Sequence, residues 1–531
     1  MKEESYQWWQ KNIIYQIYPR SFKDSDNNGT GDLPGIIEKL DYLKWLGVDC
    51  IWISPVYPSP MHDFGYDISD YKGIDPRFGT MNDFDRLLSA AKEKGIRIIM
   101  DLVPNHTSDQ HPWFLEARRS RNSEKRSWYI WKDPGKGGTV PNNWISEFAG
   151  PAWEFDEETE QYYYHTFLKE QPDLNWHNEE VQEAMWDVIR FWFDKGIDGF
   201  RIDVLWYLIK DEHFRDNPPN PDWHEGMQDH DKLIPAFSND QPYVHELVEK
   251  MRKISEKEYK DKVLIGEIYL PFHKLVTYYN KGKGVHLPFN FSLISTEWKA
   301  KEIYSTIAEY EGALSDGDWP NWVMSNHDKP RVKSRIGAGQ VRNAAILLLT
   351  LRGTPTMYYG DEIGMADVTI PKDRFQDPRA ILEPDINVGR DPQRTPMQWN
   401  DEKHAGFSNS KPWLPVDSVY KKINVKSQQQ DENSLLWLYK RLINLRNNEP
   451  ALYIGDYIPA GIQNDVIAYI RKYENDRFLI AVNLSNQKEE FIPDFSFTGK
   501  IIIASNHTQE NKEVMNKLKI DGNDGLVIRL E

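Results

Sequence analysis

Two charged residues stand two positions apart in the apolar segment Gly-Phe-Arg-Ile-Asp-Val, residues 199–204. Side chains alternate between the two faces of a strand, so Arg201 and Asp203 would share one face of a strand here. A guanidinium beside a carboxylate favours the charged form and lowers the pKa of the carboxyl. An ionised aspartate on a rigid strand end is suited to act as a nucleophile. Taken alone, such a pair is more often a buried structural ion pair.

Three further apolar segments end in polar residues, at Asp101-Leu-Val-Pro-Asn-His106, Gly266-Glu267 and Asn326-His-Asp328. If these segments are strands of one barrel, their carboxyl ends meet at a single rim. Two carboxyl groups that flank one bond, one ionised and one protonated, are the machinery of glycoside hydrolysis. The rim therefore predicts a sugar-cleaving site, although each of its residues alone has an ordinary structural explanation.

The surroundings of each rim residue indicate a role. Apolar neighbours disfavour the charged form of Glu267 and raise its pKa, which suits a general acid, whereas Asp203 suits the nucleophile. Asp328 would bind sugar hydroxyls and stabilise an oxocarbenium-like transition state. His106 and His327 would donate hydrogen bonds to hydroxyls of the same sugar.

An alternation of strands and helices is expected to position this rim. Apolar spacing predicts helices over Pro34–Leu46, ending at the cap Gly47, over Met81–Lys94, and over a segment that ends at Gly196. The segments expected as strands are Ile13–Tyr18, Cys50–Ser54, Ile96–Leu102, Phe200–Val204, Val263–Ile268, Val285–Phe291, Trp322–Ser325 and Thr354–Tyr359. This pattern predicts an α/β fold with a parallel sheet closed into a (β/α)8 TIM barrel. An open doubly wound sheet is the alternative, but no Gly-x-Gly-x-x-Gly follows the first strand, so dinucleotide binding has no support.

Two regions depart from the alternation. Residues 106–177 are rich in Trp, Tyr, Gly and Pro and lack a helical period, as expected of a functional loop or a small inserted domain. After about residue 450, short alternating segments predict an antiparallel β domain. These segments are Asp465–Arg471, Arg477–Asn483, Lys500–Ala504 and Gly525–Leu530. We therefore expect a catalytic barrel at 1–105 and 178–450, an inserted B domain at 106–177 and a C-terminal β domain at 451–531.

Composition limits the classes of partner. The chain of 531 residues has 65 Lys and Arg against 82 Asp and Glu, a formal net charge of −17, which argues against nucleic-acid binding. The single cysteine, Cys50, excludes an internal disulfide and is expected to be a buried, inert thiol. The N-terminal Met-Lys-Glu-Glu-Ser has no apolar signal core, and the chain has no run of about 18 apolar residues. A soluble, cytoplasmic protein with no membrane partner is expected.

The chain resembles the α-amylase family of glycoside hydrolases (family 13), and within it the α-glucosidase and oligo-1,6-glucosidase branch. Besides the rim motifs, the resemblance rests on Ile14-Tyr-Gln-Ile-Tyr-Pro-Arg-Ser-Phe22 and Arg394-Thr-Pro-Met-Gln-Trp399, and it extends over essentially the whole chain. It implies a catalytic barrel, a B domain inserted after the third strand and a C-terminal β domain. It also implies a retaining, exo-acting α-glucosidase that releases α-glucose from short oligosaccharides or disaccharides by double displacement.

The resemblance implies catalytic roles that match the chemical argument. Asp203 corresponds to the family's nucleophile, Glu267 to its acid/base and Asp328 to its transition-state stabiliser. The implied substrate-binding positions are Asp63, Tyr66, His106, Arg201, His327 and Arg390.

Arg390 resembles the arginine that, with Asp63, closes the pocket around the terminal glucose. Arg394 is near enough in the sequence to compete for this role. A pocket closed at one end would make the enzyme release one glucose at a time.

Two segments bear on linkage preference. Gln171-Pro-Asp-Leu-Asn175 resembles a segment that marks the oligo-1,6-glucosidase subgroup. Val204 matches members that favour α-1,6 linkages, whereas members that prefer α-1,4 linkages more often have Ala or Thr there. The alternative is that Val204 is simply a β-branched strand residue. The resemblance favours α-1,6 activity and leaves α-1,4 activity open alongside it.

The loop Asp24-Ser-Asp-Asn-Asn-Gly-Thr-Gly-Asp32 alternates oxygen-bearing residues with glycines that allow a turn, as a hard cation requires. It resembles the structural calcium or magnesium site of this branch, with Asp24, Asp26, Asn28, the carbonyl of Thr30 and Asp32 as ligands. Asn28 stands where the family usually has Asp, which removes one negative charge. An Asx-rich turn without metal is the alternative. No organic cofactor is expected.

Rival functions remain at this stage. A transglucosidase or isomerase, trehalose synthase-like or sucrose isomerase-like, shares the double displacement and differs in the acceptor. The sequence Lys-Pro-Arg-Val-Lys-Ser-Arg after Asp328 does not resemble the arginine- and aspartate-rich loop of sucrose isomerases. Transporter heavy chains share the fold, but they lack the catalytic set and carry a membrane anchor. The sequence also leaves open whether the protein is a monomer or a homodimer, and whether Asp211–Asn239 covers the active site or contacts another subunit.

Overall fold

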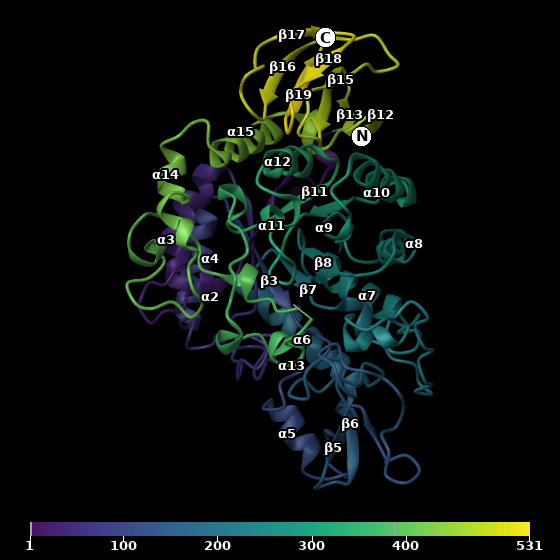
Figure 1. Cartoon of the computed structure of the whole chain (residues 1–531). Coiled ribbons are helices and arrows are strands. Elements are labelled where there is room, and N and C mark those ends of the chain that lie inside the picture. The colour runs from purple at the N-terminus through teal and green to yellow at the C-terminus, as the bar shows by residue number, and fades with distance from the viewer. Residues whose placement is uncertain (1–2, 387) are drawn as a thin grey trace.

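The computed structural model describes residues 3–386 and 388–531. A central barrel surrounded by helices lies between two smaller parts (Figure 1). The C-terminal strands, in yellow, cover one end of the barrel, and the segment that contains α5, β5 and β6, in blue, extends from the other.

Eight parallel strands form the central sheet in the order β10-β11-β1-β2-β3-β7-β8-β9. The two terminal strands of this order, β9 and β10, contact each other and close the barrel. The strands are β1 (Ile14–Ile17), β2 (Cys50–Ile53), β3 (Arg97–Leu102), β7 (Gly199–Ile202), β8 (Val263–Glu267), β9 (Leu287–Phe289), β10 (Asn321–Val323) and β11 (Thr354–Tyr358). The predicted (β/α)8 barrel is confirmed, and the open doubly wound sheet is excluded.

Alternate residues of the barrel strands pack into different cores. Ile14, Cys50 and Ile99 belong to the core inside the barrel, whereas Tyr15 and Ile51 belong to the core between the barrel and its helices. Both faces of the sheet are therefore covered, which explains why the strands are uniformly apolar. The predicted buried thiol is confirmed, because Cys50 is free and fully buried, and burial raises its pKa.

Glycines end the helices that follow the first and third strands of the barrel. Helix α3 (Leu33–Leu46) begins at Asp32, whose side chain accepts a hydrogen bond from the Gly35 amide, and ends at Gly47, with φ of 100°. A Cβ atom at Gly47 would also lie 2.7 Å from Ile443 Cγ2. Helix α6 (Glu179–Lys195) ends at Gly196 in the same left-handed conformation. The predicted caps at residues 47 and 196 are confirmed.

The remaining helices cover the barrel and connect it to the C-terminal strands. They are α1 (Trp8–Lys11), α2 (Pro19–Phe22), α4 (Met81–Glu93), α7 (Val244–Lys253), α8 (Phe272–Leu275), α9 (Ser292–Ser295), α10 (Ala300–Ala313), α11 (Val332–Ile336), α12 (Val341–Thr350), α13 (Pro378–Leu382), α14 (Val425–Gln429), α15 (Leu435–Asn448) and α16 (Pro450–Tyr453). Within the part of the chain that the structure describes, no helix is long and apolar enough to cross a membrane.

The segment after β3 carries a small antiparallel sheet with the order β4-β6-β5, formed by β4 (Trp131–Lys132), β6 (Gln161–Tyr164) and β5 (Trp153–Asp156). It also contains helix α5 (Pro112–Arg118), in a region where the sequence showed no helical period. Seven residues are too few to display a period, and the local signals are the capping side chain of His111 and the proline at the first helical position.

The C-terminal strands form one six-stranded antiparallel sheet and one two-stranded sheet. The larger has the order β12-β13-β14-β19-β16-β17 and comprises β12 (Asp456–Gln463), β13 (Val466–Tyr473), β14 (Asp476–Asn483), β16 (Thr498–Ala504), β17 (Glu513–Met515) and β19 (Gly525–Leu530). The smaller pairs β15 (Glu489–Phe491) with β18 (Leu518–Ile520). All four C-terminal strands expected from the sequence are present.

The N-terminal segment packs at the amino ends of the barrel strands, beside the C-terminal sheet (Figure 1). The Thr354 hydroxyl, at the start of β11, donates a hydrogen bond to the Trp9 carbonyl at 2.7 Å. The Tyr453 hydroxyl, shortly before β12, donates to Glu3 Oε1 at 2.7 Å. This end of the barrel is therefore opposite the rim that carries the polar residues.

Strand β7 ends at Ile202, two residues earlier than the sequence suggested. Asp203 follows it and still donates its amide to the Leu102 carbonyl, at 2.8 Å. Val204 has φ of 38° and ψ of 45°, a left-handed conformation that is costly for a β-branched residue. The interpretation of Val204 as an ordinary strand residue is therefore wrong.

Candidate active site

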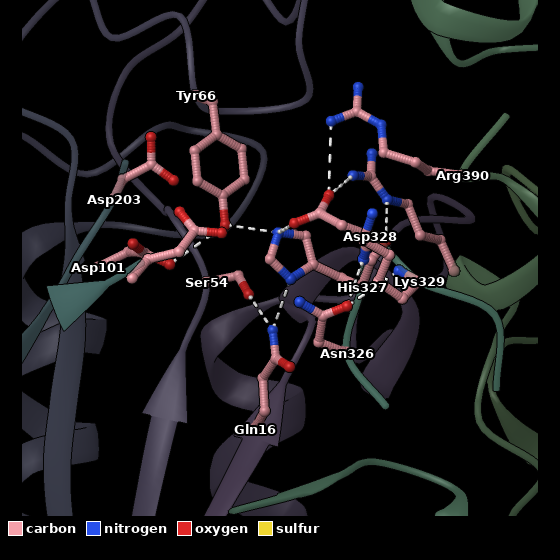
Figure 2. Close-up of polar contacts among 12 residues, drawn as sticks. Gln16, Ser54, Tyr66, Asp101, Asp203, Asn326, His327, Asp328, Lys329 and Arg390 are labelled. Carbon is pink, nitrogen blue, oxygen red and sulfur yellow. Dashed lines mark hydrogen bonds and ion pairs between the residues drawn. The ribbon is translucent and has the colours of Figure 1, made fainter. Parts of the chain in front are cut away.

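The predicted site residues converge on one cavity of about 770 Å³ at the carboxyl ends of the barrel strands. Eight of them line it: Asp63, Tyr66, His106, Asp203, Glu267, His327, Asp328 and Arg390. The ninth, Arg201, is 1% exposed and lies directly behind the carboxyl groups. Figure 2 shows Asp101 and Asp203 on one side of Tyr66, and His327 and Asp328 on the other. The predicted meeting of residues 203, 267 and 328 at one rim is thus seen in the structure.

The guanidinium of Arg201 joins carboxyl groups from three adjacent strands. Its Nη1 atom donates hydrogen bonds to Asp101 Oδ1 at 2.8 Å and to Asp203 Oδ1 at 2.7 Å. Its Nη2 atom lies 2.8 Å from Glu267 Oε2. The same Glu267 oxygen accepts the amide of Val204 at 2.9 Å, so the left-handed turn after the strand directs a donor at it.

Protonation of this cluster is governed by burial. Burial raises the pKa of the Asp203 carboxyl, the Arg201 guanidinium opposes the rise, and the negative charge of Glu267 adds to it. Burial also raises the pKa of the Glu267 carboxyl, against the opposing charge of Arg201. The expectation that Arg201 lowers the pKa of Asp203 is therefore wrong in its net direction, because three buried carboxyl groups share one guanidinium. Asp203 and Glu267 together therefore keep one proton up to a higher pH than an isolated carboxyl group keeps its own proton.

Asp328 has the opposite electrostatic environment. Although burial favours its neutral form, His327, Arg394 and Arg390 hold the pKa of its carboxyl well below the usual range. Arg394 Nη2 donates to Asp328 Oδ1 at 2.9 Å, and His327 Nε2 lies 3.1 Å from Oδ2. His327 is also held by Tyr66, whose hydroxyl lies 2.7 Å from Nε2 (Figure 2). Asp328 is thus an ionised carboxylate, fixed in orientation.

One side of the cavity is closed by an ion pair between residues far apart in the chain. Arg390 Nη2 donates to Asp63 Oδ1 at 2.6 Å and to Asp377 Oδ1 at 2.7 Å. Arg390 and Arg394 both approach Asp328, but among the contacts of the described residues only Arg390 reaches Asp63. The structure therefore places Arg390, and not its competitor Arg394, at the closed side.

Three polar groups contact the ring of His106. Lys210 Nζ donates to Asn105 Oδ1 at 2.7 Å, and Asn105 Nδ2 donates to Asp173 Oδ2 at 2.9 Å, which together orient the Asn105 amide. Its Nδ2 group lies 3.2 Å from His106 Nδ1. His106 Nε2 lies 3.1 Å from both the Tyr66 carbonyl and Gln171 Nε2. Burial lowers the pKa of His106, so the ring is neutral.

The mouth of the cavity is formed by loops of the barrel and of the inserted region. Each of the segments 145–148, 204–207, 228–239 and 269–274 contributes residues to its lining. The later part of the segment Asp211–Asn239 therefore lies at the active site, which is one of the two arrangements the sequence left open. The Tyr207 hydroxyl donates to Glu147 Oε1 at 2.5 Å and connects the barrel to the inserted region there.

The sequence model described as the catalytic domain of alpha amylase matches residues 16–455. The chain belongs to the α-amylase family. It is 38% identical to an oligo-1,6-glucosidase of Parageobacillus thermoglucosidasius over 97% of both chains. It is also 38% identical to a trehalose-6-phosphate hydrolase of Bacillus subtilis (strain 168), again over 97% of both. Among solved structures, an alpha-glucosyl transfer enzyme matches with a TM-score of 0.94 and 38% identity, covering 99% of this chain and 100% of that chain.

Three residues that shape the site of this α-amylase family member were not assigned a role from the sequence. Asp101 stands at the end of β3 and could have been singled out by that position. Asp377 and Lys210 follow no strand, and their partners Arg390 and Asn105 are 13 and 105 residues away in the sequence. The sequence contains no local signal for either residue.

The acidic loop lies outside the cavity. Oxygen atoms of Asp24, Asp26 and Asp32 come within 4.8 Å of one another. Asp24 accepts backbone amides on both oxygens, from Asn27 at 2.7 Å and from Gly29 at 2.8 Å, but each oxygen keeps a second lone pair. The donor set fits a hard divalent cation.

Asn28 and Thr30, the other predicted ligands, lie in the same turn. The Asn28 side chain donates to Asp26 Oδ2 at 3.0 Å and accepts the Thr30 amide at 2.8 Å. These contacts keep both residues beside the three aspartates.

Replacing Lys210 by Met should lower the melting temperature by several degrees, because Asp173 would keep a fully buried carboxylate without its cation. Lys210 Nζ lies 2.5 Å from Asp173 Oδ2, and removing one partner of a buried pair costs about 3–5 kcal/mol. The matched control is Lys372→Met, which removes an exposed pair with Asp385 and should leave the melting temperature nearly unchanged.

Thermal unfolding followed by circular dichroism measures both variants. The double variant Lys210→Met/Asp173→Asn should recover part of the loss. An unchanged melting temperature in Lys210→Met would contradict the structural role of the pair.

Proposed function

We propose that this glycoside hydrolase is a retaining, exo-acting α-glucosidase that releases α-glucose from the non-reducing ends of short α-glucosides. The observation that carries the proposal is the contact of Asp203 and Glu267 with one guanidinium, in a cavity closed on one side by Arg390 and Asp63. A retaining mechanism needs its two carboxyl groups closer together than an inverting mechanism does, and a shared guanidinium keeps these two groups close. The similarity to oligo-1,6-glucosidases supports the same reaction.

In the first step, Asp203 attacks the anomeric carbon, and Glu267 gives its proton to the oxygen of the departing group. The shared proton of the buried pair supplies both an acid and a carboxylate at neutral pH. In the second step, Glu267 takes a proton from water, which displaces Asp203 and restores the original configuration at the anomeric carbon.

The remaining residues bind the glucosyl unit and stabilise positive charge. The carboxylate of Asp328, kept ionised by its basic neighbours, would interact with sugar hydroxyls and with the developing oxocarbenium ion. His106, which lines the cavity, would donate a hydrogen bond to a hydroxyl of the same sugar. Arg390 and Asp63 would bind the hydroxyls furthest from the cleaved bond, which limits release to one glucose at a time.

Linkage preference is part of the proposal. Val204 lines the cavity next to Asp203, and its unusual backbone conformation places its side chain and its amide at the reaction centre. We therefore assign α-1,6 linkages as a substrate class, with α-1,4 linkages alongside. Transglucosylation is the second candidate, favoured by the similarity to an alpha-glucosyl transfer enzyme.

A cation in the acidic loop is also proposed, with Asp24, Asp26, Asn28, Thr30 and Asp32 holding calcium or magnesium. The cation would neutralise the negative charge of three clustered carboxylates. It would stabilise the folded chain and take no part in catalysis. The cytoplasmic location and the choice between monomer and homodimer stay predictions from the sequence.

Changing Asp203 to Asn should reduce glucose release from isomaltose by at least about a thousandfold, because the nucleophile of the double displacement is lost. The control Asp187→Asn alters an exposed aspartate of α6 and should retain full activity.

In the unmodified enzyme, initial rates on isomaltose should at least equal those on maltose, and the first glucose detected by proton NMR should be the α anomer. Initial release of the β anomer would exclude a retaining mechanism.

The pH dependence of kcat/KM should be bell-shaped, with its alkaline limb above 4.5, the ordinary pKa of a glutamic acid. The folded-state pKa of Glu267 is raised, so the acid is protonated below that value and activity falls as pH rises through it. The variant Glu267→Gln can be assayed with a dinitrophenyl α-glucoside, because the dinitrophenolate leaving group needs no proton. With this substrate, the pH profile of the variant should have no alkaline limb. An unchanged limb in that variant would assign the titration to another group.

Calcium should raise the melting temperature of chelator-treated protein, since a ligand that binds only the folded chain stabilises it. Asp26→Ala should abolish this response, and Asp385→Ala, an exposed aspartate elsewhere, should leave it intact. Differential scanning calorimetry at increasing calcium and magnesium concentrations provides the measurement. Equal melting temperatures with and without both cations would indicate an Asx-rich turn instead.

A further inference from the structure

A second cavity, the inserted-domain cavity, lies between the inserted region and the chain that follows β7. It has a volume of about 780 Å³, close to that of the active-site cavity, and among the described residues the two cavities share no lining residue. Its walls are formed by residues from the segments 121–132, 175–177 and 208–214, together with Gln161 of β6. A concave site of this size can hold a small organic molecule.

Positive charge is concentrated in the lining of the inserted-domain cavity. Four cations line it, Arg121, Arg126, Lys132 and Lys210. Among the described lining residues the one acid is Glu212, whose side chain is 73% exposed. The chain as a whole has a formal net charge of −17, so the lining has the opposite sign. A concave surface of one charge attracts ligands of the other, and the cavity therefore favours an anion.

Arg126 is buried in this lining without a carboxylate partner. It is 9% exposed, and its Nη2 atom donates to Thr159 Oγ1 at 3.0 Å and to Gln161 Oε1 at 2.6 Å, which are both neutral acceptors. Asp156, whose charge reaches Arg126, is already paired with Arg118 at 2.6 Å. Burial lowers the pKa of Arg126 to about 10, so the guanidinium is still charged at neutral pH. A buried charge without a partner is costly, and a bound anion would offset this cost.

Lys132 is the second cation of the lining without an acid. It takes part in no ion pair with the described residues, whereas Arg121 and Lys210 have carboxylate partners at 3.2 and 2.5 Å. Its Nζ atom lies 3.9 Å from the centroid of the Phe214 ring, which holds the ammonium group at the cavity. No described residue accepts a hydrogen bond from this group in the structure, so its N–H donors are available to a ligand.

Aromatic rings stand beside the two unpaired cations. Arg126 Cζ lies 3.4 Å from the centroid of the Trp131 ring, and the rings of Tyr129, Trp176 and Phe214 also line the cavity. The Nε atom of Arg126 and the indole Nε1 of Trp131 are buried donors that have no hydrogen-bond partner among the described residues. Buried donors in folded proteins almost always have an acceptor, so an occupant rich in oxygen atoms would complete this part of the cavity.

We propose that the inserted-domain cavity binds an anionic sugar, a pyranose that carries a phosphate or a carboxylate group. Arg126 and Lys132 would hold the anion, because a guanidinium and an ammonium both form charge-assisted hydrogen bonds with phosphate and carboxylate oxygens. The aromatic rings would pack against the apolar C–H face of the pyranose, and the lining amides of Asn122, Gln161 and Asn175 would bind its hydroxyls. This binding site is separate from the catalytic one and does not depend on the reaction proposed there.

Isothermal titration calorimetry on the full chain tests the proposal with four probes: glucose 6-phosphate, glucuronate, inorganic phosphate and glucose. At least one of the two anionic sugars should bind more tightly than phosphate and glucose do, and its affinity should fall as salt is added. Comparison of the two anionic sugars shows whether the anion is a phosphate or a carboxylate.

Substitutions of Lys132 locate the binding. In Lys132→Gln the Kd of the anionic sugar should rise on the order of tenfold, as expected for the loss of one charge-assisted hydrogen bond. Lys132→Arg keeps the charge and should retain most of the affinity. The matched control is Lys125→Gln, which changes another cation of the inserted region that lies 3.3 Å from a ring centroid, that of Trp128, but does not line this cavity. It should leave the Kd unchanged.

Each outcome decides the inference. No binding of either anionic sugar to the folded wild-type protein would overturn it. Inorganic phosphate that binds as tightly as the anionic sugars would overturn the assignment of a sugar, and an unchanged Kd in Lys132→Gln would overturn the assignment to this cavity. Thermal unfolding followed by circular dichroism confirms that the variants are folded. Cleavage of isomaltose by the same preparations tests the proposed function independently, since that reaction belongs to the other cavity.

Discussion

The guanidinium of Arg201 is the interaction on which the rest of the site depends. It is fully enclosed and holds Asp101, Asp203 and Glu267, which come from the ends of three adjacent barrel strands. Without this cation, three carboxyl groups would be buried together with no opposite charge, an arrangement that proteins avoid. Arg201 therefore stabilises the rim and, through the same contacts, fixes the distance between the two groups that carry out the chemistry.

Electrostatic environment, and not residue type, separates the roles of the carboxyl groups. Asp203 and Glu267 have raised pKa values because burial and the negative charges of neighbouring carboxyl groups outweigh one shared guanidinium. Asp328 has a lowered pKa because two arginines and a histidine surround it alone. A single rim thus contains a proton donor and a permanent anion at the same pH, which is the combination that glycoside cleavage requires.

The features that could be predicted from the sequence are those that depend on a local pattern of residues. The barrel strands are aliphatic runs whose carboxyl ends carry the functional residues, so both the fold and the rim could be inferred. Helix α5 was too short to show a period, and the left-handed Val204 contradicts the strand preference of a β-branched residue. The net pKa of Asp203 depends on Asp101 and Glu267, which are distant along the chain. The closure by Arg390 was available only through resemblance, and its partner Asp377 carried no sequence signal at all.

The N-terminal segment lies at the amino ends of the barrel strands and the C-terminus lies in the strands that cover that end, whereas the cavity opens at the carboxyl ends (Figure 1). A fusion partner or a surface-attachment tag placed at either end would therefore project away from the substrate's entry path. Immobilised on a solid support in this orientation, the enzyme would present its open mouth to the bulk solution, and the C-terminal strands would act as a spacer between catalyst and surface (Figure 1).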